Sequence, residues 1–147
     1  MSNGLHITVA VIIERDGKFL MVEELSDDKP VFNQPAGHVE NGESLVDAAI
    51  RETFEETGRQ VAIDCLISVY RWQVPESGET YFRVLFGGHV LQHDPERTLD
   101  EGILRALWIT PDELRQAQSR LRSPLVMRGI SDFLNNVRYP LDLIVDM

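Results

Sequence analysis

Three glutamates near the middle of the chain stand at a spacing that could bind a cation. Glu52, Glu55 and Glu56 are related as i, i+3 and i+4, so in an α-helix their carboxylates would gather on one side within about one turn. Like charges at this spacing repel one another, and the helix dipole disfavours anions near the C-terminal end. A cluster of carboxylate oxygens is nevertheless the ligand set that Mg²⁺ or Mn²⁺ prefers, with positions left for water and phosphate.

The glutamates have two possible interpretations, a metal site or a solvated acidic surface. The helix face on which they lie distinguishes between the two. At about 100° per residue, the glutamates continue the stripe of Leu45, Ala48 and Ala49. A purely solvated acidic face would more naturally lie opposite an apolar stripe. Carboxylates directed at the protein interior must be paired, protonated or metal-bound, and Arg51 alone cannot neutralise three of them. We therefore predict a divalent-cation site, with an acidic surface face as the alternative.

The segment around these glutamates resembles the Nudix box, whose pattern is GX5EX7REUXEEXGU, where U is a bulky apolar residue. All seven fixed letters match at the right spacing, whereas Thr53 and Arg59 stand where the family usually has apolar residues. Both are packing positions, so these departures affect the expected packing more than the expected chemistry. The matching residues are Gly37, Glu43, Arg51, Glu52, Glu55, Glu56 and Gly58.

The resemblance implies the Nudix fold, an α/β (α+β) class α/β/α sandwich with a mixed β-sheet. It also implies hydrolysis of a nucleoside diphosphate linked to another group, or of a related pyrophosphate, with Mg²⁺ or Mn²⁺ as cofactor. Carried over to this chain, Glu52 and Glu56 are the main metal ligands, Glu55 is a further or water-bridged ligand, and the Gly37 carbonyl joins the shell. Such cations neutralise phosphate charge and lower the pKa of a bound water aligned for in-line attack on phosphorus.

The resemblance further implies roles for residues that act on the carboxylates or on the attacking water. Glu52 is the first candidate for the general base. In some family members an acid in a later loop takes that role, and here Glu101 is the candidate, as base or additional ligand, with a solvated loop acid as the alternative. Arg51 would orient the carboxylates through hydrogen-bonded ion pairs. Glu43 would hold the loop-to-helix geometry, for example by pairing with Arg51.

Three segments outside the box, residues 32–38, 121–126 and 138–141, resemble the NudJ-type phosphatases of this family. That resemblance implies release of orthophosphate from nucleoside tri- and diphosphates and from thiamine-type pyrophosphates. An ADP-ribose or nucleotide-sugar pyrophosphatase, or a nucleoside triphosphate pyrophosphohydrolase, is the alternative within the family. A nucleotide-binding regulatory domain without turnover is the alternative from another class, and the intact glutamate set argues against it.

Candidates for contacting the substrate lie on two long strand-like runs and just before the box. Arginines there could clamp phosphate oxygens, aromatic rings could stack on a ring, and amides could bind a base or pyrimidine edge. Cross-strand packing, surface charge or turn formation is the alternative for each. For Arg122 and Arg138 a helix cap or an ion pair is favoured over phosphate binding. The six candidates are Asn33, Gln34, Arg71, Trp72, Tyr81 and Arg83.

Length and charge limit the classes of function. A chain of 147 residues can bury its own core, and we expect one domain over residues 1–147. A net charge of −10 argues against a nucleic-acid polymer or an anionic membrane as partner, but it allows a small phosphorylated substrate bridged by cations. The single cysteine, Cys65, excludes an internal disulfide and a multi-cysteine metal cluster. A cytoplasmic monomer or homodimer is expected, since no signal or membrane-spanning pattern is present.

The elements that must position the glutamates follow from turn and cap signals. Ser44 is the expected N-cap and Gly58 the C-terminal stop of the helix that carries them. Asp16-Gly17 predicts a hairpin turn, and residues 26–30 and 75–79 are expected loops. Thr110-Pro111 predicts a second helix start, a third helix is expected over residues 124–135, and the tail is expected to be irregular and packed down. The expected strands are residues 6–13, 19–22, 32–39, 61–74, 81–90 and 103–109.

Overall fold

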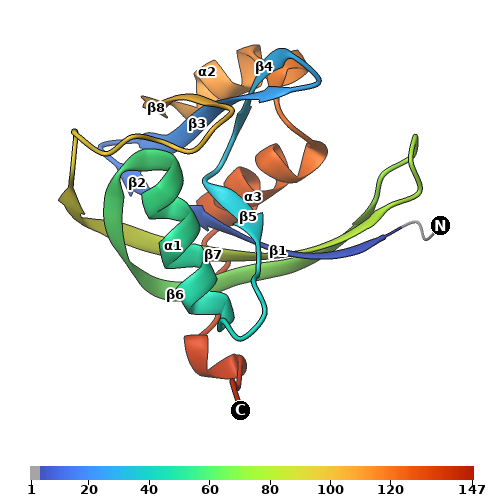
Figure 1. Cartoon of the computed structure of the whole chain (residues 1–147), viewed down its shortest axis with the longest axis vertical. Helices are drawn as coiled ribbons and strands as arrows, with labels where there is room; N and C mark the ends of the chain where they lie inside the picture. Colours follow the sequence, from blue (N-terminus) through green and yellow to red (C-terminus); the bar gives the residue numbers. More distant parts are fainter. Residues whose placement is uncertain (1–3) are drawn as a thin grey trace.

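A mixed four-stranded sheet forms the centre of the molecule in a computed structural model, which we describe for residues 4–147 (Figure 1). Strand β1 (Leu5–Ile12) lies between β5 (Ala36–His38), which is antiparallel to it, and β7 (Thr80–His93), which is parallel. Strand β6 (Arg59–Gln73) completes the sheet as the antiparallel partner of β7. The long β6–β7 hairpin carries its connecting loop away from the body of the molecule (Figure 1).

A second, antiparallel sheet is built around β3 (Lys18–Ser26). Strand β8 (Ile103–Ile109) pairs with β3 along one edge. The other edge pairs with the short β2 (Glu14–Arg15) and with β4 (Lys29–Asn33). Because β4 and β5 follow one another closely in the chain but belong to different sheets, residues 34 and 35 connect the two sheets.

Helices cover both faces of the central sheet, as the side chains of β1 on its two faces show. Its Val9 and Val11 side chains belong to a core cluster with the buried alanines of α1 (Leu45–Thr57), whereas Ala10 and Ile12 belong to a second cluster with α3 (Pro124–Leu134). A strand buried on both faces reads as a continuous apolar run rather than an alternating one. The predicted α/β/α sandwich with a mixed sheet is therefore confirmed. The remaining helical segments are α2 (Pro111–Gln116), η1 (Gln118–Arg120) and η2 (Leu141–Leu143).

The helix ends lie where the cap signals placed them. The Ser44 hydroxyl accepts a hydrogen bond from the Asp47 N–H at 3.1 Å, and α1 ends at Gly58 in a left-handed conformation (φ +71°) that glycine adopts without strain. At α2, Thr110 and Glu113 form a complete capping box in front of the first helical turn. These local signals fix the start and the direction of both helices.

One expected loop is a strand hairpin. Residues 26–30 were predicted to be irregular, but β3 continues to Ser26 and β4 begins at Lys29, with Ser26 paired to Lys29. Asp27 and Asp28 both have positive φ (51° and 64°), as a two-residue type I′ turn requires. The turn was missed because its usual signal is Asn-Gly or Asp-Gly, and two consecutive aspartates in this conformation are uncommon.

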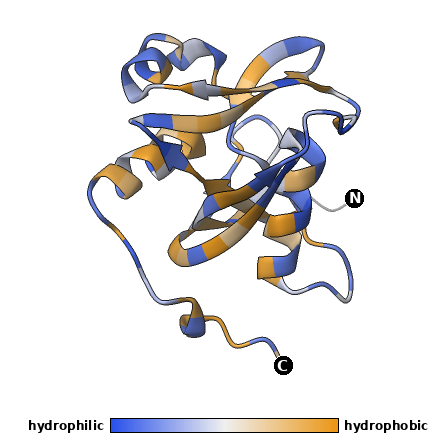
Figure 2. Cartoon of the chain, turned by 90° about the vertical axis from the view of Figure 1, so that its left-hand side faces the viewer, coloured by the Kyte–Doolittle hydropathy of each residue, from blue (hydrophilic) through white to orange (hydrophobic). Residues whose placement is uncertain are grey.

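After α3 the chain runs to the C-terminus at the lower end of the molecule (Figure 2) and bridges to β6 on the way. The Tyr139 and Leu66 backbones exchange two hydrogen bonds of 2.7 and 2.9 Å. Leu141 and Ile144 then pack against the core cluster on the α1 side, while Val145 is exposed. The predicted packing of the tail is therefore confirmed in part. Within residues 4–147, no helix has the length and apolar character needed to span a membrane.

Candidate active site

The face of α1 that was expected to carry metal ligands points into the structure. Ala48 and Ala49 are fully buried, and Glu56 is only 8% exposed. Thr53, at an apolar position of the motif, is buried too, and its hydroxyl donates to the Ala49 carbonyl at 2.8 Å. This bond satisfies the polar group. The carboxylates thus continue the buried stripe, and α1 is not an acidic surface helix.

Three carboxylates converge at the C-terminal half of α1. Glu52, Glu55 and Asp100 each place one oxygen within 4.8 Å of the others. Asp100 comes from the loop between β7 and β8, and its backbone N–H donates to the Glu55 carbonyl at 3.0 Å. Glu56 lies beside this cluster and accepts a hydrogen bond from the Ala36 N–H of β5 at 3.0 Å. Hard oxygen atoms in this number suit a divalent cation.

The later loop brings Asp100, the neighbour of the predicted Glu101, into the group of converging carboxylates. Glu101 is exposed and does not belong to the group of converging carboxylates, whereas its neighbour Asp100 does. The backbone bond from Asp100 to Glu55 ties that residue, and not the next one, to the end of the helix. Sequence alone offered two adjacent acids, and no pattern distinguished them.

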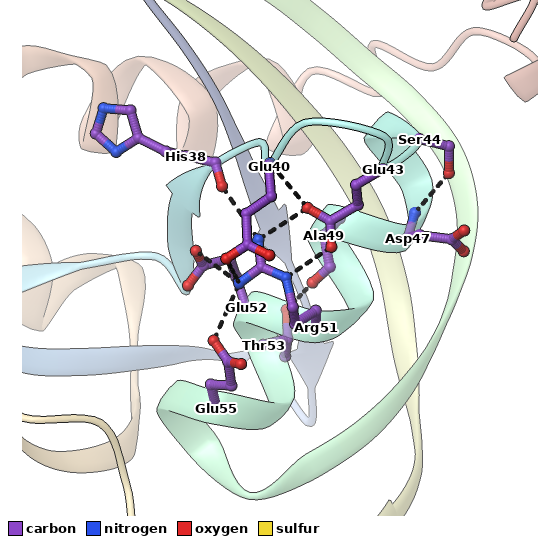
Figure 3. A network of polar contacts seen from close by, with 10 residues as sticks. All are labelled: His38, Glu40, Glu43, Ser44, Asp47, Ala49, Arg51, Glu52, Thr53 and Glu55. Carbon is purple, nitrogen blue, oxygen red and sulfur yellow. Dashed lines mark hydrogen bonds and ion pairs between the residues drawn. The ribbon is translucent and has the colours of Figure 1, made fainter.

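A single guanidinium organises the carboxylates (Figure 3). Arg51 donates to both oxygens of Glu43, at 2.6 and 2.9 Å, in the bidentate geometry that arginine favours. It also donates to Glu52 at 3.2 Å, to Glu55 at 3.0 Å and to the His38 carbonyl at 3.1 Å. The expected Arg51–Glu43 pairing is therefore present, and it joins the loop before α1 to the candidate metal ligands.

Gly37 lies directly against Glu52. A Cβ atom at this position would overlap the Glu52 carboxylate, so glycine is what allows that carboxylate to occupy its observed position. The carbonyl of Gly37 was predicted to be a metal ligand. Gly37 lies beside the carboxylate cluster, which is consistent with that prediction. The same strand provides the Ala36 N–H that holds Glu56.

Burial dominates the electrostatics of the two inner carboxylates. It raises the pKa of Glu52 to about 7, against the lowering effect of Arg51, and raises the pKa of Glu56 to about 9. In contrast, hydrogen bonds from Arg51 and from the Glu40 N–H lower the pKa of Glu43 to about 2. Glu43 is therefore a fixed anion, while Glu52 and Glu56 need further positive charge to ionise fully at neutral pH. A divalent cation would supply it.

A cavity of about 650 Å³ opens beside the carboxylates. Ala36 and Gly37, which contact Glu56 and Glu52, belong to its wall. A substrate whose phosphates lie at the carboxylates can therefore place its organic group in this cavity. Pockets of this volume accommodate small organic ligands.

The floor of the cavity contains two of the predicted substrate residues, Asn33 and Arg83, and Arg83 is hydrogen-bonded to Asn33 and to a third, Gln34. The Arg83 guanidinium donates to the side-chain oxygens of Asn33, at 3.1 Å, and Gln34, at 2.6 Å. Gln34 in turn donates to the Val126 carbonyl of α3 at 3.0 Å and is fully buried. Asn33 and Arg83 face the cavity, whereas Gln34 is not among the residues that line it. Gln34 is placed to hold Arg83 rather than to touch a ligand.

The two predicted aromatic residues line the cavity, and Arg71 does not. Trp72 and Tyr81 are register partners on β6 and β7, with ring centroids 6.4 Å apart. Tyr81 also stacks on His6 at 4.4 Å. Successive side chains of a strand point to opposite faces, so Arg71, which precedes Trp72, belongs to the other face, where it is exposed.

Two charged residues of the cavity were missed or assigned another role. Glu24, on β3, lines the cavity and was not singled out. Arg122 forms the expected ion pair, with its Nε 3.3 Å from Glu24, and also lines the cavity. The predicted cap at Arg138 is present, since this side chain donates to the Phe133 carbonyl near the end of α3. The available sequence signal for Glu24 was an acidic pair directly after the apolar run Phe19–Val22.

Comparisons with known proteins agree with the geometry. A family model described as NUDIX domain matches residues 4–128. Phosphatase NudJ of Escherichia coli K12 is 41% identical over 141 residues, covering 96% of this chain and 91% of the relative, and the same values hold for Phosphatase NudJ of Shigella flexneri. The solved structure of a NUDIX hydrolase from Nitrosomonas europaea is 45% identical with a TM-score of 0.95, covering 97% of each chain. The chain therefore belongs to the Nudix family of hydrolases and is a homologue of phosphatase NudJ.

Proposed function

We propose that this chain is a phosphohydrolase that uses Mg²⁺ or Mn²⁺ to release orthophosphate from nucleoside tri- and diphosphates and from thiamine-type pyrophosphates. The observation that carries the proposal is the convergence of Glu52, Glu55 and Asp100 within 4.8 Å, next to a cavity that can hold the organic group. The names of the NudJ relatives support a phosphatase. A cytoplasmic location is proposed with it, supported by the single cysteine of the chain.

The residues that would hold the cation are Glu52, Glu55, Glu56 and Asp100, with the carbonyl of Gly37. When bound, the cation would neutralise phosphate charge and lower the pKa of a coordinated water. The chain itself supplies the orientation: Arg51 fixes Glu52 and Glu55 relative to each other, and β5 fixes Glu56. Fixed carboxylates lose little rotamer freedom when a ligand binds, which favours affinity and alignment.

In the proposed reaction a water oxygen attacks the terminal phosphorus, and the bond from that phosphorus to the bridging oxygen breaks. We assign the proton of the water to Glu52, because this carboxylate lies in the cluster with Glu55 and Asp100 and a cation bound there would keep it ionised and able to accept a proton. The bridging oxygen leaves with the organic phosphate and takes up a proton. The products are orthophosphate and the shortened phosphate ester.

A product assay tests this proposal. GDP, GTP, thiamine pyrophosphate and ADP-ribose are incubated with the protein and Mg²⁺ or Mn²⁺, and orthophosphate and pyrophosphate are measured separately. We expect orthophosphate from GDP and thiamine pyrophosphate, and loss of this activity on addition of a chelator. Cleavage of ADP-ribose alone, or release of pyrophosphate from GTP as the main product, would replace the proposal with one of the two other family activities.

A further inference from the structure

We propose that Glu24 selects the substrate by accepting a hydrogen bond from an N–H, of the ring or of an amino group on it, at the edge of a planar nitrogen heterocycle held in the cavity. This inference rests on the proposed function, because it takes the cavity as the place of the organic group. It adds a specificity-determining residue and a substrate class: diphosphates whose organic group is a ring with an N–H donor on its edge.

The position of Glu24 is the first argument. Its side chain lines the cavity and is 16% exposed, directly after five buried residues of β3. A carboxylate at such a place has lost most of its water and needs partners. Burial raises the pKa of Glu24, and the neighbouring guanidiniums of Arg122 and Arg83 act in the opposite direction.

The second argument is the oxygen that the protein leaves without a partner. Both contacts of Glu24 are long and reach the same atom: Oε2 lies 3.4 Å from the Asn33 Nδ2 and 3.3 Å from the Arg122 Nε. Among residues 4–147, Oε1 has no hydrogen-bond donor. An acceptor that has lost most of its water and is free on the wall of a cavity is complementary to a ligand N–H.

Glu23, the preceding residue, shows what a purely structural pair looks like in this strand. Its two oxygens are both engaged, Oε1 by Arg105 at 2.8 Å and Oε2 by Arg120 at 2.5 Å. Glu23 and Glu24 thus point to opposite faces of β3. Of the two, only Glu24, on the cavity face, has a carboxylate oxygen without a donor among residues 4–147. The long contact to Arg122 alone does not explain why Glu24 is buried there.

The surroundings of Glu24 define the ligand. Arg122 uses only its Nε on Glu24, so within the described part of the chain its two terminal nitrogens remain able to donate to a ring oxygen or nitrogen next to the N–H. Trp72 offers a flat aromatic wall to the same cavity. An acceptor, adjacent donors and a stacking surface together fit a nucleobase or a similar heterocycle, and they offer little to an alkyl diphosphate.

The test compares one substrate pair and one matched variant pair. UDP and 3-methyluridine diphosphate differ only by methylation of the ring N–H, and isopentenyl diphosphate carries no ring. Glu24→Gln keeps the shape of the side chain, and Glu14→Gln removes the same charge from an exposed site on β2 outside the cavity. Steady-state kcat and KM are measured for all three compounds, and binding of the two uridine compounds is measured by calorimetry.

We expect methylation of the ring N–H to lower kcat/KM of the unchanged chain about 10- to 100-fold, mainly through KM, as loss of a hydrogen bond to a charged group does. In Glu24→Gln the amide oxygen faces the donors Asn33 and Arg122, so its NH2 faces the cavity and cannot accept the ligand N–H. The value for UDP therefore falls by a similar factor, and the methylation effect shrinks to less than threefold. Turnover of isopentenyl diphosphate stays within twofold, and Glu14→Gln behaves like the unchanged chain.

Other outcomes separate the inference from the proposed function. Equal effects of Glu24→Gln on UDP and isopentenyl diphosphate, or no effect on either, would overturn the inference while leaving the hydrolase intact. Binding of UDP that depends on Glu24, without hydrolysis of any diphosphate, would support the inference and overturn the proposed function. Absence of both binding and hydrolysis would overturn both.

Discussion

The carboxylate face of α1 and the floor of the cavity differ in how their buried charges are paired. The floor consists of the lining residues Glu24, Asn33, Arg83 and Arg122. Around α1, Glu43, Glu52 and Glu55 share one guanidinium, that of Arg51, while Glu56 accepts a backbone N–H instead. Burial raises the pKa values of Glu52 and Glu56. On the cavity floor, Arg83 is held by two neutral amide oxygens, and Arg122 is matched to a single carboxylate.

The difference shows which partner each region needs. An excess of desolvated negative charge is stable only if a cation joins it or protons neutralise it. A nearly balanced set of donors and acceptors needs no counter-ion, and its unused hydrogen-bonding atoms are available to a neutral ring. The two regions meet at Ala36 and Gly37 of β5, so a substrate with a charged end and a neutral end can bind both at once.

Glu56→Gln has the largest expected effect, because it tests whether the charge excess on α1 is functional. The glutamine Oε1 can still accept the Ala36 N–H, so the fold should be kept. We expect kcat to fall about 10³-fold, equivalent to about 4 kcal/mol of transition-state stabilisation. Circular dichroism and steady-state assays in Mg²⁺ measure the two properties. Asp47→Asn, an exposed acid on the same helix, is the control, and turnover of Glu56→Gln equal to that control would remove the role assigned to the cluster.

Gly37→Ala tests the junction between the two regions. The new methyl group would occupy the space of the Glu52 carboxylate, so Glu52 must move away from Arg51 and Asp100. We expect activity to fall about 100-fold, since a misplaced catalytic group costs about that much, with only a small change in Tm. A variant that keeps full activity would show that Glu52 does not work in the position described. Assays over a range of Mn²⁺ concentrations distinguish weaker cation binding from slower chemistry.

Asp100→Asn and Glu101→Gln form a matched pair that sharpens the boundary of the charged region. Asp100 contributes an oxygen to the cluster, and Glu101 is exposed outside it. We expect Asp100→Asn to lower kcat/KM about 10- to 100-fold and to raise the Mg²⁺ concentration needed for half-maximal activity. Glu101→Gln should stay within about twofold. The reverse order would restore Glu101 as the acid of the later loop.

These two regions were not equally predictable from sequence. The α1 site is local: helical periodicity places residues 52, 55 and 56 on one side, and cap residues fix where the helix begins and ends. Its chemistry could therefore be inferred from one short segment.

The two-aspartate turn between β3 and β4 was missed, because a positive φ at non-glycine residues is set by the strand pairing around it as much as by the residues themselves.

The cavity floor, in contrast, is assembled from residues far apart in the chain. Arg83 meets Asn33 and Gln34 across about fifty residues, and Glu24 meets Arg122 across nearly a hundred. Strand alternation could have excluded Arg71 once Trp72 and Tyr81 were placed on one face, but the register that pairs them is a tertiary property. Residue type alone therefore identified some of the residues that line the cavity. It could not predict which residues they contact.

Glu23 and Glu24 allow the smallest but most direct comparison, because neighbouring acids on β3 have pKa values shifted in opposite directions. Hydrogen bonds from Arg105 and Arg120 lower the pKa of Glu23 below its usual 4.5, so its stabilisation is present above pH 4.5 and is lost as pH falls through the lowered value. We expect Glu23→Gln to cost about 1–2 kcal/mol at pH 7, and this difference should shrink as the pH is lowered from 5 to 3. Burial raises the pKa of Glu24, so its ionisation opposes folding and Glu24→Gln should leave stability at pH 7 unchanged or higher. Urea unfolding of both variants across this pH range measures the contrast, and an equal loss in both would mean that Glu24, like Glu23, is held for stability.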